Sequence, residues 1–285
     1  MLSVAPIRTA KVPGGETLPI LGQGTWRMGE DKSKRNSEVA ALRVGIELGM
    51  TVIDTAEMYA SGGAEKVVGE AIAGCRDQVF VVTKFYPQNA TRERMAAACD
   101  RSLRRLGVEQ IDLYLVHWRG DVPLKETLAG FDDLLEAQKI RHAGVSNFDV
   151  EDMEELARIK GGLERIVTNQ VLYNLERRGI EWDLLPWMRK RHRSVMAYSP
   201  VEEGLLTHAH PVLKAVAERH DATPAQIALA WVIRADGVIA IPKAADSKHV
   251  RENRGAADIK LTKRDLDELD ESFPAPEGRK PLESR

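Results

Sequence analysis

The chain has 285 residues, of which 43% are hydrophobic and 29% are charged, and its formal net charge is −2. These values are ordinary for a globular protein with a large core, and they give no basis for binding nucleic acid or an anionic membrane. The two cysteines, Cys75 and Cys99, are too few for a disulfide framework and lack metal-ligand spacing. Because the sequence contains neither a signal-peptide pattern nor a membrane-length apolar run, we expect a cytoplasmic protein.

Apolar periodicity and turn residues divide the chain into alternating strands and helices. In chain order, the sequence predicts a hairpin around the turn 12–15, a strand from 19 into a loop at 26, a helix over 37–48, a strand over 51–54, a helix over 64–73, a strand over 79–84, a helix over 91–106, a strand over 111–117, a helix over 124–137, a strand over 140–146, a helix over 150–160, a strand over 166–170, a helix over 180–192, a strand over 194–199, helices over 212–219 and 225–235, a strand over 238–241, and helices over 248–256 and 261–272. Residues after Pro274 are expected to be loose.

This alternation predicts parallel strands joined by crossover helices. Eight repeats with no linker between halves fit a closed (β/α)8 barrel, a TIM barrel, better than an open sheet. We therefore expect one α/β barrel domain over residues 1–285, preceded by a β-hairpin and followed by an extra C-terminal helix.

In such a barrel, the residues at the carboxyl ends of the strands surround one site. The predicted strand ends carry Trp26, Asp54, Lys84, His117, Ser146, Asn147, Gln170, Tyr198, Ser199 and Lys243. One or two polar ends would be expected wherever strands meet water. Because every end is polar, charged or aromatic, a functional site is the better interpretation.

The residue types indicate proton transfer. Asp54, at the end of an apolar strand, needs a cation, and Lys84 can supply it. The same lysine is expected to lower the pKa of Tyr59, which would make the phenol a general acid or base. His117 can orient a carbonyl oxygen or share the proton. A lone lysine would suggest Schiff-base chemistry, but a lysine paired with a carboxylate stays charged and is a poor nucleophile.

The remaining strand ends suit a bound hydride carrier. Asn147 and Gln170 are amides that match the carboxamide of a nicotinamide, Tyr198 offers a ring for stacking, and Lys243 can meet a phosphate.

These motifs resemble those of the aldo-keto reductases over nearly the whole chain. The matching motifs are IDTAEMY with Asp54 and Tyr59, VVTKF with Lys84, LVHW with His117, GVSNF with Ser146 and Asn147, TNQ with Gln170, AYSP with Tyr198 and Ser199, and IPK with Lys243. Among family members, bacterial reductases of methylglyoxal and small aldehydes are the most similar. The resemblance implies that Tyr59 protonates the carbonyl while NADPH delivers hydride, with Asp54 and Lys84 tuning Tyr59 and His117 orienting the carbonyl. It also implies that Ser146, Asn147 and Gln170 hold the carboxamide, Tyr198 stacks on the nicotinamide, and Lys243 meets the 2′-phosphate.

The cofactor motif departs from the family pattern at two positions. His249 stands where the family commonly has a basic residue that packs on adenine, and Ala244 replaces a frequent serine. Glu252 and Asn253 still match the adenine-contacting pair. We expect NADPH as cofactor, with weaker discrimination against NADH.

The substrate end is expected to be small and open. Trp26 and Trp118 are predicted to touch substrate, and Glu57 and Met58 to line the approach to Tyr59. A short C-terminal segment favours small aldehydes and α-dicarbonyls over steroids. Glu202 and Glu203 are expected to point away from the cofactor phosphates.

Alternatives to a reductase are weaker. A nicotinamide-binding regulatory or redox-sensing subunit with slow turnover would need an interaction surface or extension. A barrel hydrolase or lyase would need a carboxylate pair or metal cluster, and His208 and His210 alone are interpreted as solvated. We therefore expect a monomeric enzyme with a small carbonyl substrate and with no metal, nucleic-acid or membrane partner.

Overall fold

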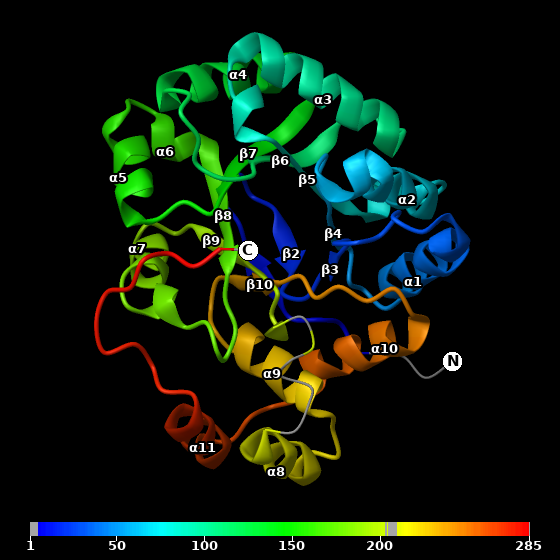
Figure 1. Cartoon of the computed structure of the whole chain (residues 1–285), viewed down its shortest axis with the longest axis vertical. Helices are drawn as coiled ribbons and strands as arrows, with labels where there is room; N and C mark the ends of the chain where they lie inside the picture. The colour runs from blue at the N-terminus through cyan, green and yellow to red at the C-terminus, as the bar shows by residue number, and fades with distance from the viewer. Residues whose placement is uncertain (1–4, 203, 205–209, 285) are drawn as a thin grey trace.

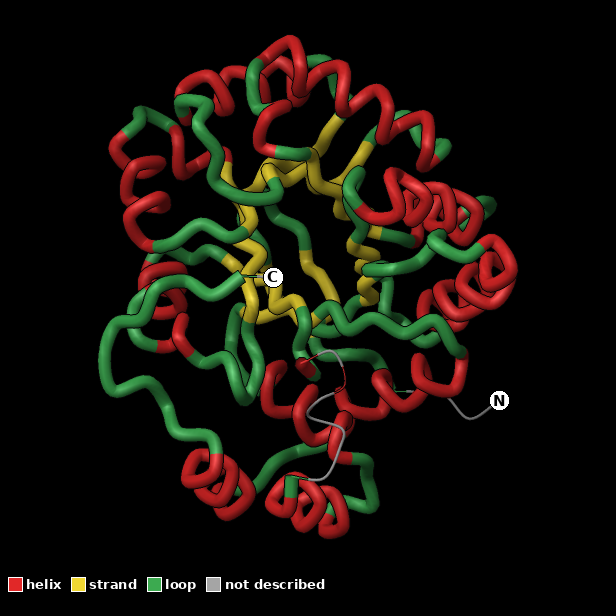
Figure 2. The backbone as a smooth tube through the Cα atoms, in the orientation of Figure 1, coloured by secondary structure: helices red, strands yellow, loops and turns green. Residues whose placement is uncertain are grey.

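The computed structural model describes residues 5–202, 204 and 210–284. Parallel strands form an inner ring that helices surround (Figures 1 and 2). The order of the eight sheet strands follows the chain from β3 to β10, and parallel bridges from Leu21 to Ala240 and from Gly24 to Lys243 join the two ends. The sheet closes, so the (β/α)8 prediction is confirmed.

The barrel strands are β3 (Gln23–Gly24), β4 (Val52–Asp54), β5 (Phe80–Phe85), β6 (Ile111–Val116), β7 (Ile140–Ser146), β8 (Ile166–Leu172), β9 (Ser194–Tyr198) and β10 (Val238–Ala240). The helices are α1 (Arg35–Glu47), α2 (Gly63–Ile72), α3 (Arg92–Leu106), α4 (Leu124–Glu136), α5 (Val150–Arg158), α6 (Gly162–Arg165), α7 (Leu184–Lys190), α8 (Pro211–Arg219), α9 (Pro224–Ile233), α10 (Ser247–Gly255) and α11 (Lys263–Ser272). None of the helices in the described part of the chain is long and apolar enough to cross a membrane.

The core explains why the strands lack polar alternation. Every residue of β5, β6 and β8 is buried, because one strand face meets the barrel interior and the other meets helices. Small residues permit the closure itself. A Cβ atom on Gly24 would lie 2.7 Å from the carbonyl oxygen of Ile241, so a larger residue would force β3 away from the segment after β10.

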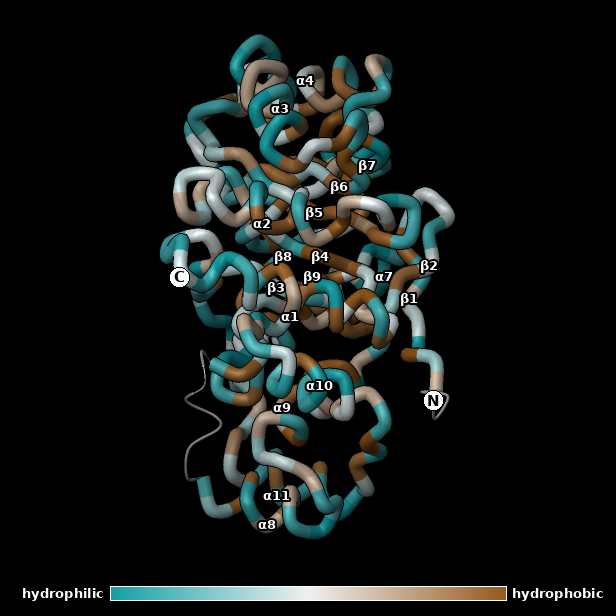
Figure 3. The backbone as a smooth tube through the Cα atoms, turned by 90° about the vertical axis from the view of Figure 1, so that its right-hand side faces the viewer, coloured by the Kyte–Doolittle hydropathy of each residue, from teal (hydrophilic) through white to brown (hydrophobic). Residues whose placement is uncertain are grey.

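The two ends of the barrel differ. The predicted N-terminal hairpin is present as β1 (Thr9–Lys11) and β2 (Thr17–Pro19), which pair antiparallel. It lies at one end of the barrel, and the C-terminal segment lies at the other (Figures 1 and 3). The site predicted at the strand ends therefore shares its end with the C-terminal segment.

Two sequence predictions are wrong, one about the helix over 180–192 and one about the residues after Pro274. The helix expected over 180–192 is split into a 3-10 turn, η5 (Gly179–Glu181), and α7. Asp183 caps α7, which puts Pro186 in its first turn, where a missing backbone N–H costs no helix hydrogen bond.

The C-terminal segment expected to be loose is held by ion pairs. Arg279 contacts Glu151, and its Nε lies 3.1 Å from Asp183 Oδ2. Glu283 accepts a 2.8 Å hydrogen bond from Nη1 of Arg177. These partners lie far away in sequence, so local composition carries no signal of them.

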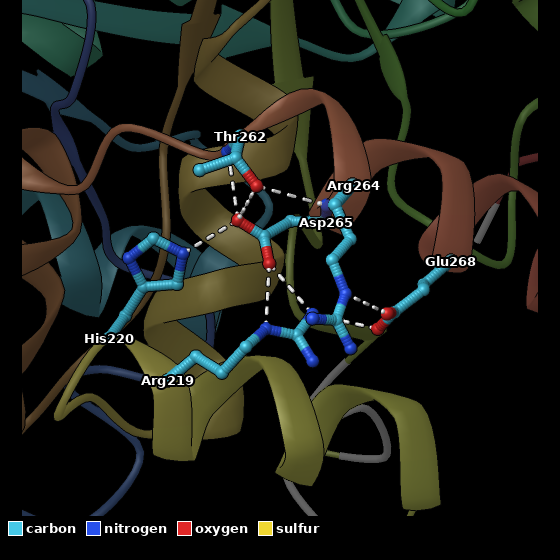
Figure 4. A network of polar contacts seen from close by, with 6 residues as sticks. All are labelled: Arg219, His220, Thr262, Arg264, Asp265 and Glu268. Carbon is cyan, nitrogen blue, oxygen red and sulfur yellow. Dashed lines mark hydrogen bonds and ion pairs between the residues drawn. The ribbon is translucent and has the colours of Figure 1, made fainter.

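Helices α8 and α11 lie outside the main ring and are joined by a polar network (Figures 1 and 4). Asp265, which is 1% exposed, accepts hydrogen bonds from Arg219, from the backbone and hydroxyl of Thr262, and pairs with His220 at 2.8 Å. Burial alone would raise the pKa of Asp265, but hydrogen bonds from His220, Thr262 and Arg219 hold it well below its usual range.

We predict that Asp265→Asn lowers the free energy of unfolding by about 2 kcal/mol, because buried donors lose a charged acceptor. A carboxylate with a depressed folded pKa stabilises above its unfolded value near 3.9, and this contribution is lost as the pH falls toward the folded value. The difference between the two proteins should therefore shrink below about pH 4. Denaturant unfolding followed by circular dichroism measures it.

Asp267→Asn is the matched control, because Asp267 lies on the same helix, is 61% exposed, and pairs with an exposed lysine, Lys263. It should change stability by less than about 0.5 kcal/mol. Equal losses in the two variants at neutral pH would contradict the role given to Asp265.

Candidate functional site

Strand register places Lys84 beside Asp54. Strands β4 and β5 pair with Asp54 opposite Val82. Because alternate residues of a strand share a face, Lys84 lies on the face of Val82, one layer closer to the carboxyl end of the barrel. Its Nζ donates to Asp54 Oδ2 at 2.8 Å, so the predicted ion pair is confirmed.

Lys84 is fully buried and its ammonium group is saturated. Nζ also donates to the backbone oxygen of Thr55 at 2.8 Å and to Tyr59 Oη at 3.2 Å. Burial would lower the pKa of Lys84, but Asp54 and Tyr59 outweigh it and raise that pKa above its usual value. A charged ammonium with three acceptors is not available as a nucleophile.

Asp54 is held from two sides. Its second oxygen, Oδ1, accepts a 2.7 Å hydrogen bond from Gln170 Nε2. Burial raises the pKa of Asp54, and Lys84 and Gln170 oppose that rise. The amide nitrogen of Gln170 is thereby committed to Asp54, whereas its Oε1 makes no hydrogen bond with any residue that the structure describes, and Gln170 lines the pocket.

The prediction that Lys84 brings the pKa of Tyr59 below its usual value is wrong. Burial of the phenol raises its pKa above 10.0, and the attraction of Lys84 offsets only part of that rise. Trp26 contributes to this enclosure, with its ring edge-on to the Tyr59 ring at 5.1 Å between centroids. The hydroxyl of Tyr59 therefore carries its proton at neutral pH, and Tyr59 lines the pocket.

The loop that carries Tyr59 is anchored and bent. Glu57, predicted to line the approach, instead accepts from Tyr86 N at 2.8 Å and from Asn89 Nδ2 at 2.9 Å, and it contacts Arg101. It does not line the pocket. Directly after Tyr59, Ala60 adopts a left-handed conformation with φ of 50°, which is costly for a residue with a Cβ.

His117 faces Tyr59 as a neutral imidazole. The two ring centroids are 5.8 Å apart at an angle of 73°. Burial, followed by repulsion from Lys84, lowers the pKa of His117 to about 2. Its Nδ1 is buried without a hydrogen-bond partner among the described residues, so we assign the proton to Nε2 and a bare lone pair to Nδ1. The imidazole can thus donate a hydrogen bond from Nε2 but cannot act as a cation.

Asn147 is fixed between neighbouring strands. Its Nδ2 donates to the backbone oxygen of His117 at 3.1 Å, and its Oδ1 accepts from Tyr198 Oη at 2.9 Å. Ser146 donates to the backbone oxygen of Gln170 at 2.9 Å. The structure therefore joins the ends of β6, β7, β8 and β9 through side chains predicted to bind cofactor.

A single pocket of about 1000 Å³ gathers these residues. Among the predicted residues, it is lined by Trp26, Asp54, Met58, Tyr59, His117, Ser146, Asn147, Gln170, Tyr198, Ser199, Lys243, His249, Glu252 and Asn253. Lys84 lies beneath it. Trp118 is outside the lining, 36% exposed, and packs on His117 at 5.1 Å between ring centroids. Trp118 is thus placed behind His117 rather than on the pocket wall.

Several lining residues were not predicted. They are Arg27, Lys34, Thr223, Pro224, Ala225 and Asp246, among others. Their signals in sequence were weak, because a surface cation or a helix N-terminus becomes part of a site only through the way distant segments meet.

The end of the pocket around Lys243 is lined by three cations, Arg27, Lys34 and Lys243, against two carboxylates, Asp246 and Glu252. Partial burial is the main cause that lowers the pKa of Lys243, and Lys34 and Arg27 lower it further, against Glu38 and Glu30. His249 and Glu252 lie on α10, with their side chains 3.9 Å apart. An anionic group is the ligand that suits this end.

The segment after β9 lies over the pocket through Pro200, Val201 and Gly204. Glu202 points away, as predicted, because its carboxylate accepts from Asn174 Nδ2 at 2.6 Å and Arg177 Nε at 3.0 Å. Glu203 and His208 lie outside the described residues. Within the described ranges, no group of three or more histidine, cysteine, aspartate or glutamate side chains is arranged to hold a metal ion.

Known proteins are similar to this chain over nearly its whole length. The chain is 51% identical over 276 residues to methylglyoxal reductase YeaE of Escherichia coli K12, covering 95% of this chain and 96% of that protein. It is 31% identical over 265 residues to glyoxal reductase of Bacillus subtilis 168, covering 92% and 91%. An aldo/keto reductase from Klebsiella pneumoniae, solved in complex with NADP and acetate, is 48% identical and superposes with a TM-score of 0.94 over 98% of this chain and 100% of that chain. The model of the Aldo/keto reductase family matches residues 20–273, and the chain belongs to that family.

Proposed function

We propose that the protein reduces small aldehydes and α-dicarbonyls such as methylglyoxal to alcohols, with NADPH as the hydride donor. One observation carries the proposal: the Tyr59 hydroxyl, 3.2 Å from the buried ammonium of Lys84, opens beside His117 into one pocket. The names of the relatives in Escherichia coli and Bacillus subtilis support the dicarbonyl class. The NADP-bound relative from Klebsiella pneumoniae supports the cofactor.

The residues that line the pocket fit a nicotinamide dinucleotide that carries a phosphate group. The pocket has room for an extended ligand, and both amide and cationic side chains line it. Arg27 and Lys243 make no hydrogen bond or ion pair with any residue that the structure describes, so both are available to an anion. Asn147 and the Oε1 of Gln170 would hold the carboxamide, Tyr198 would stack on the nicotinamide ring, and Lys243 would meet the phosphate end. When bound, the reduced nicotinamide supplies the hydride.

The chain's own residues supply the proton and stabilise the negative charge that its transfer leaves on Tyr59. His117 Nε2 donates to the substrate carbonyl oxygen and positions it, while Tyr59 Oη gives its proton to that oxygen. The phenolate that forms lies 3.2 Å from Lys84 Nζ, whose charge is already fixed by Asp54. Since Tyr59 is neutral before transfer and anionic after it, Lys84 stabilises the transition state more than the ground state.

Steady-state rates test the proposal. We expect NADPH oxidation with methylglyoxal at about 1 s⁻¹ or faster, and kcat/KM for methylglyoxal at least about tenfold above that for a sugar or a steroid ketone. A slow nicotinamide-binding regulator would bind NADPH without this turnover. If methylglyoxal, the sugar and the steroid ketone all failed to stimulate NADPH oxidation, the proposed function would be overturned.

Tyr59→Phe should lower kcat about 100- to 10,000-fold, because the variant retains the ring but has no proton to give. NADPH affinity, measured by titration calorimetry, should stay within about threefold of wild type, since the hydroxyl is proposed to act on substrate. Tyr86→Phe is the control: Tyr86 lies on the next strand's loop, outside the pocket lining, and its variant should keep wild-type rates. Wild-type turnover in Tyr59→Phe would rule out Tyr59 as the acid.

We also propose that the enzyme acts as a cytoplasmic monomer of one barrel domain, with a mass of 31.7 kDa in solution. Both cysteines are free, which suits a reducing compartment.

A further inference from the structure

Barrel closure brings the segment after β3 to the phosphate end of the pocket. Gly24 N donates to the backbone oxygen of Pro242 at 2.9 Å, and Gly24 bridges to Lys243. The chain then runs through Arg27 to a 3-10 turn, η1 (Lys32–Lys34), which leads into α1, and α1 packs against α10. Lys34 therefore lines the same pocket as Lys243 and His249.

The position of Lys34 along the pocket follows from its neighbours. Trp26 contacts the ring of Tyr59 and marks the catalytic end. Arg27 comes next in the chain, and Lys34 lies beyond it, at the start of the helix that packs on α10. Since α10 carries His249, Glu252 and Asn253, Lys34 belongs to the adenosine end rather than to the nicotinamide end.

The cations at this end are only partly compensated. Arg27 and Lys243 have no acidic partner within ion-pair distance in the described chain, and Lys34 Nζ lies 3.9 Å from Asp31 Oδ2, with both side chains exposed. The nearby carboxylate of Glu38 is buried and accepts from Gly29 N at 2.9 Å. Partial burial is the main cause that lowers the pKa of Lys243, and repulsion from Lys34 and Arg27 adds to it against the attraction of Glu38 and Glu30. Such like charges are unfavourable together unless an anion meets them.

An exposed lysine beside an aspartate is ordinarily a solvated surface pair. Two features argue otherwise for Lys34: it lines the pocket, and its neighbours at 244 and 249 are an alanine and a histidine. Alanine has no side-chain donor, and a histidine offers two ring nitrogens where an arginine would offer five N–H donors. Ala244 and His249 thus offer fewer phosphate donors than a serine and an arginine would, and Lys34 on η1 adds a cation to the same pocket.

We propose that Lys34 is a specificity-determining residue that, together with Lys243, binds the 2′-phosphate of NADPH. This inference rests on the proposed use of a nicotinamide dinucleotide. It replaces the expectation that Ala244 and His249 leave discrimination against NADH weak. Lys34 supplies a positive charge from the segment after β3, which meets the segment after β10 where the barrel closes. NADH carries no 2′-phosphate, so Lys34 affects one nucleotide and not the other.

Titration calorimetry of the full-length protein with NADPH and with NADH tests the inference. Lys34→Gln should raise the Kd for NADPH about tenfold, the scale of a charge-assisted hydrogen bond at a partly exposed site, and leave the Kd for NADH within about twofold. Lys34→Arg should keep the Kd for NADPH within about threefold of wild type, because it retains the charge.

Lys32→Gln is the matched control, since Lys32 lies on the same 3-10 turn, is exposed, and does not line the pocket. It should leave both Kd values unchanged. Lys34→Gln with an unchanged Kd for NADPH, or with equal losses for NADPH and NADH, would overturn the inference while leaving the proposed function intact. Wild-type protein that binds neither nucleotide would overturn both.

Discussion

The structure depends on a buried ammonium group with three fixed acceptors. An isolated lysine at a fully buried position would cost several kcal/mol, so Lys84 is tolerated only because Asp54, Thr55 and Tyr59 all accept from it. Strand register sets this geometry. Asp54 ends β4 and pairs with Val82 of β5, and Lys84 lies two residues beyond Val82 on that strand. The fold therefore fixes a positive charge under the hydroxyl of Tyr59 before any ligand arrives.

The fixed charge of Lys84 could act in two ways, by ionising Tyr59 in the resting protein or by stabilising a phenolate formed during proton transfer. Lys84 does not generate a phenolate in the resting protein, because burial keeps the pKa of Tyr59 above its usual value. In the proposed reaction, its charge would instead stabilise the phenolate that proton transfer creates. Neutral His117 complements this arrangement, since an imidazolium beside Lys84 would add a second buried cation. Tyr59 and His117 can thus both donate to one carbonyl oxygen.

The sequence is sufficient to predict the features that depend on the order of the strands and on the residues at their carboxyl ends. The alternation of elements predicts a closed barrel, and the cost of burying Asp54 predicts its ion pair with Lys84, which the structure confirms. Features that depend on packing between distant segments were missed or mistaken. Arg279 holds the C-terminal segment through Glu151, and Lys34 reaches the pocket only because β3 meets the segment after β10. The direction of the Tyr59 pKa likewise depends on how completely Trp26 and its neighbours exclude water, which residue types alone do not specify.

Protonation of Tyr59 in the free protein is the point on which the chemical account rests. Ultraviolet difference spectra of wild type and Tyr59→Phe, recorded between about pH 6 and pH 11, isolate the phenolate of this one tyrosine. The account predicts that the two proteins differ by no phenolate signal below about pH 10, the usual tyrosine pKa. A phenolate that titrates near neutral pH in wild type and is missing from Tyr59→Phe would contradict it.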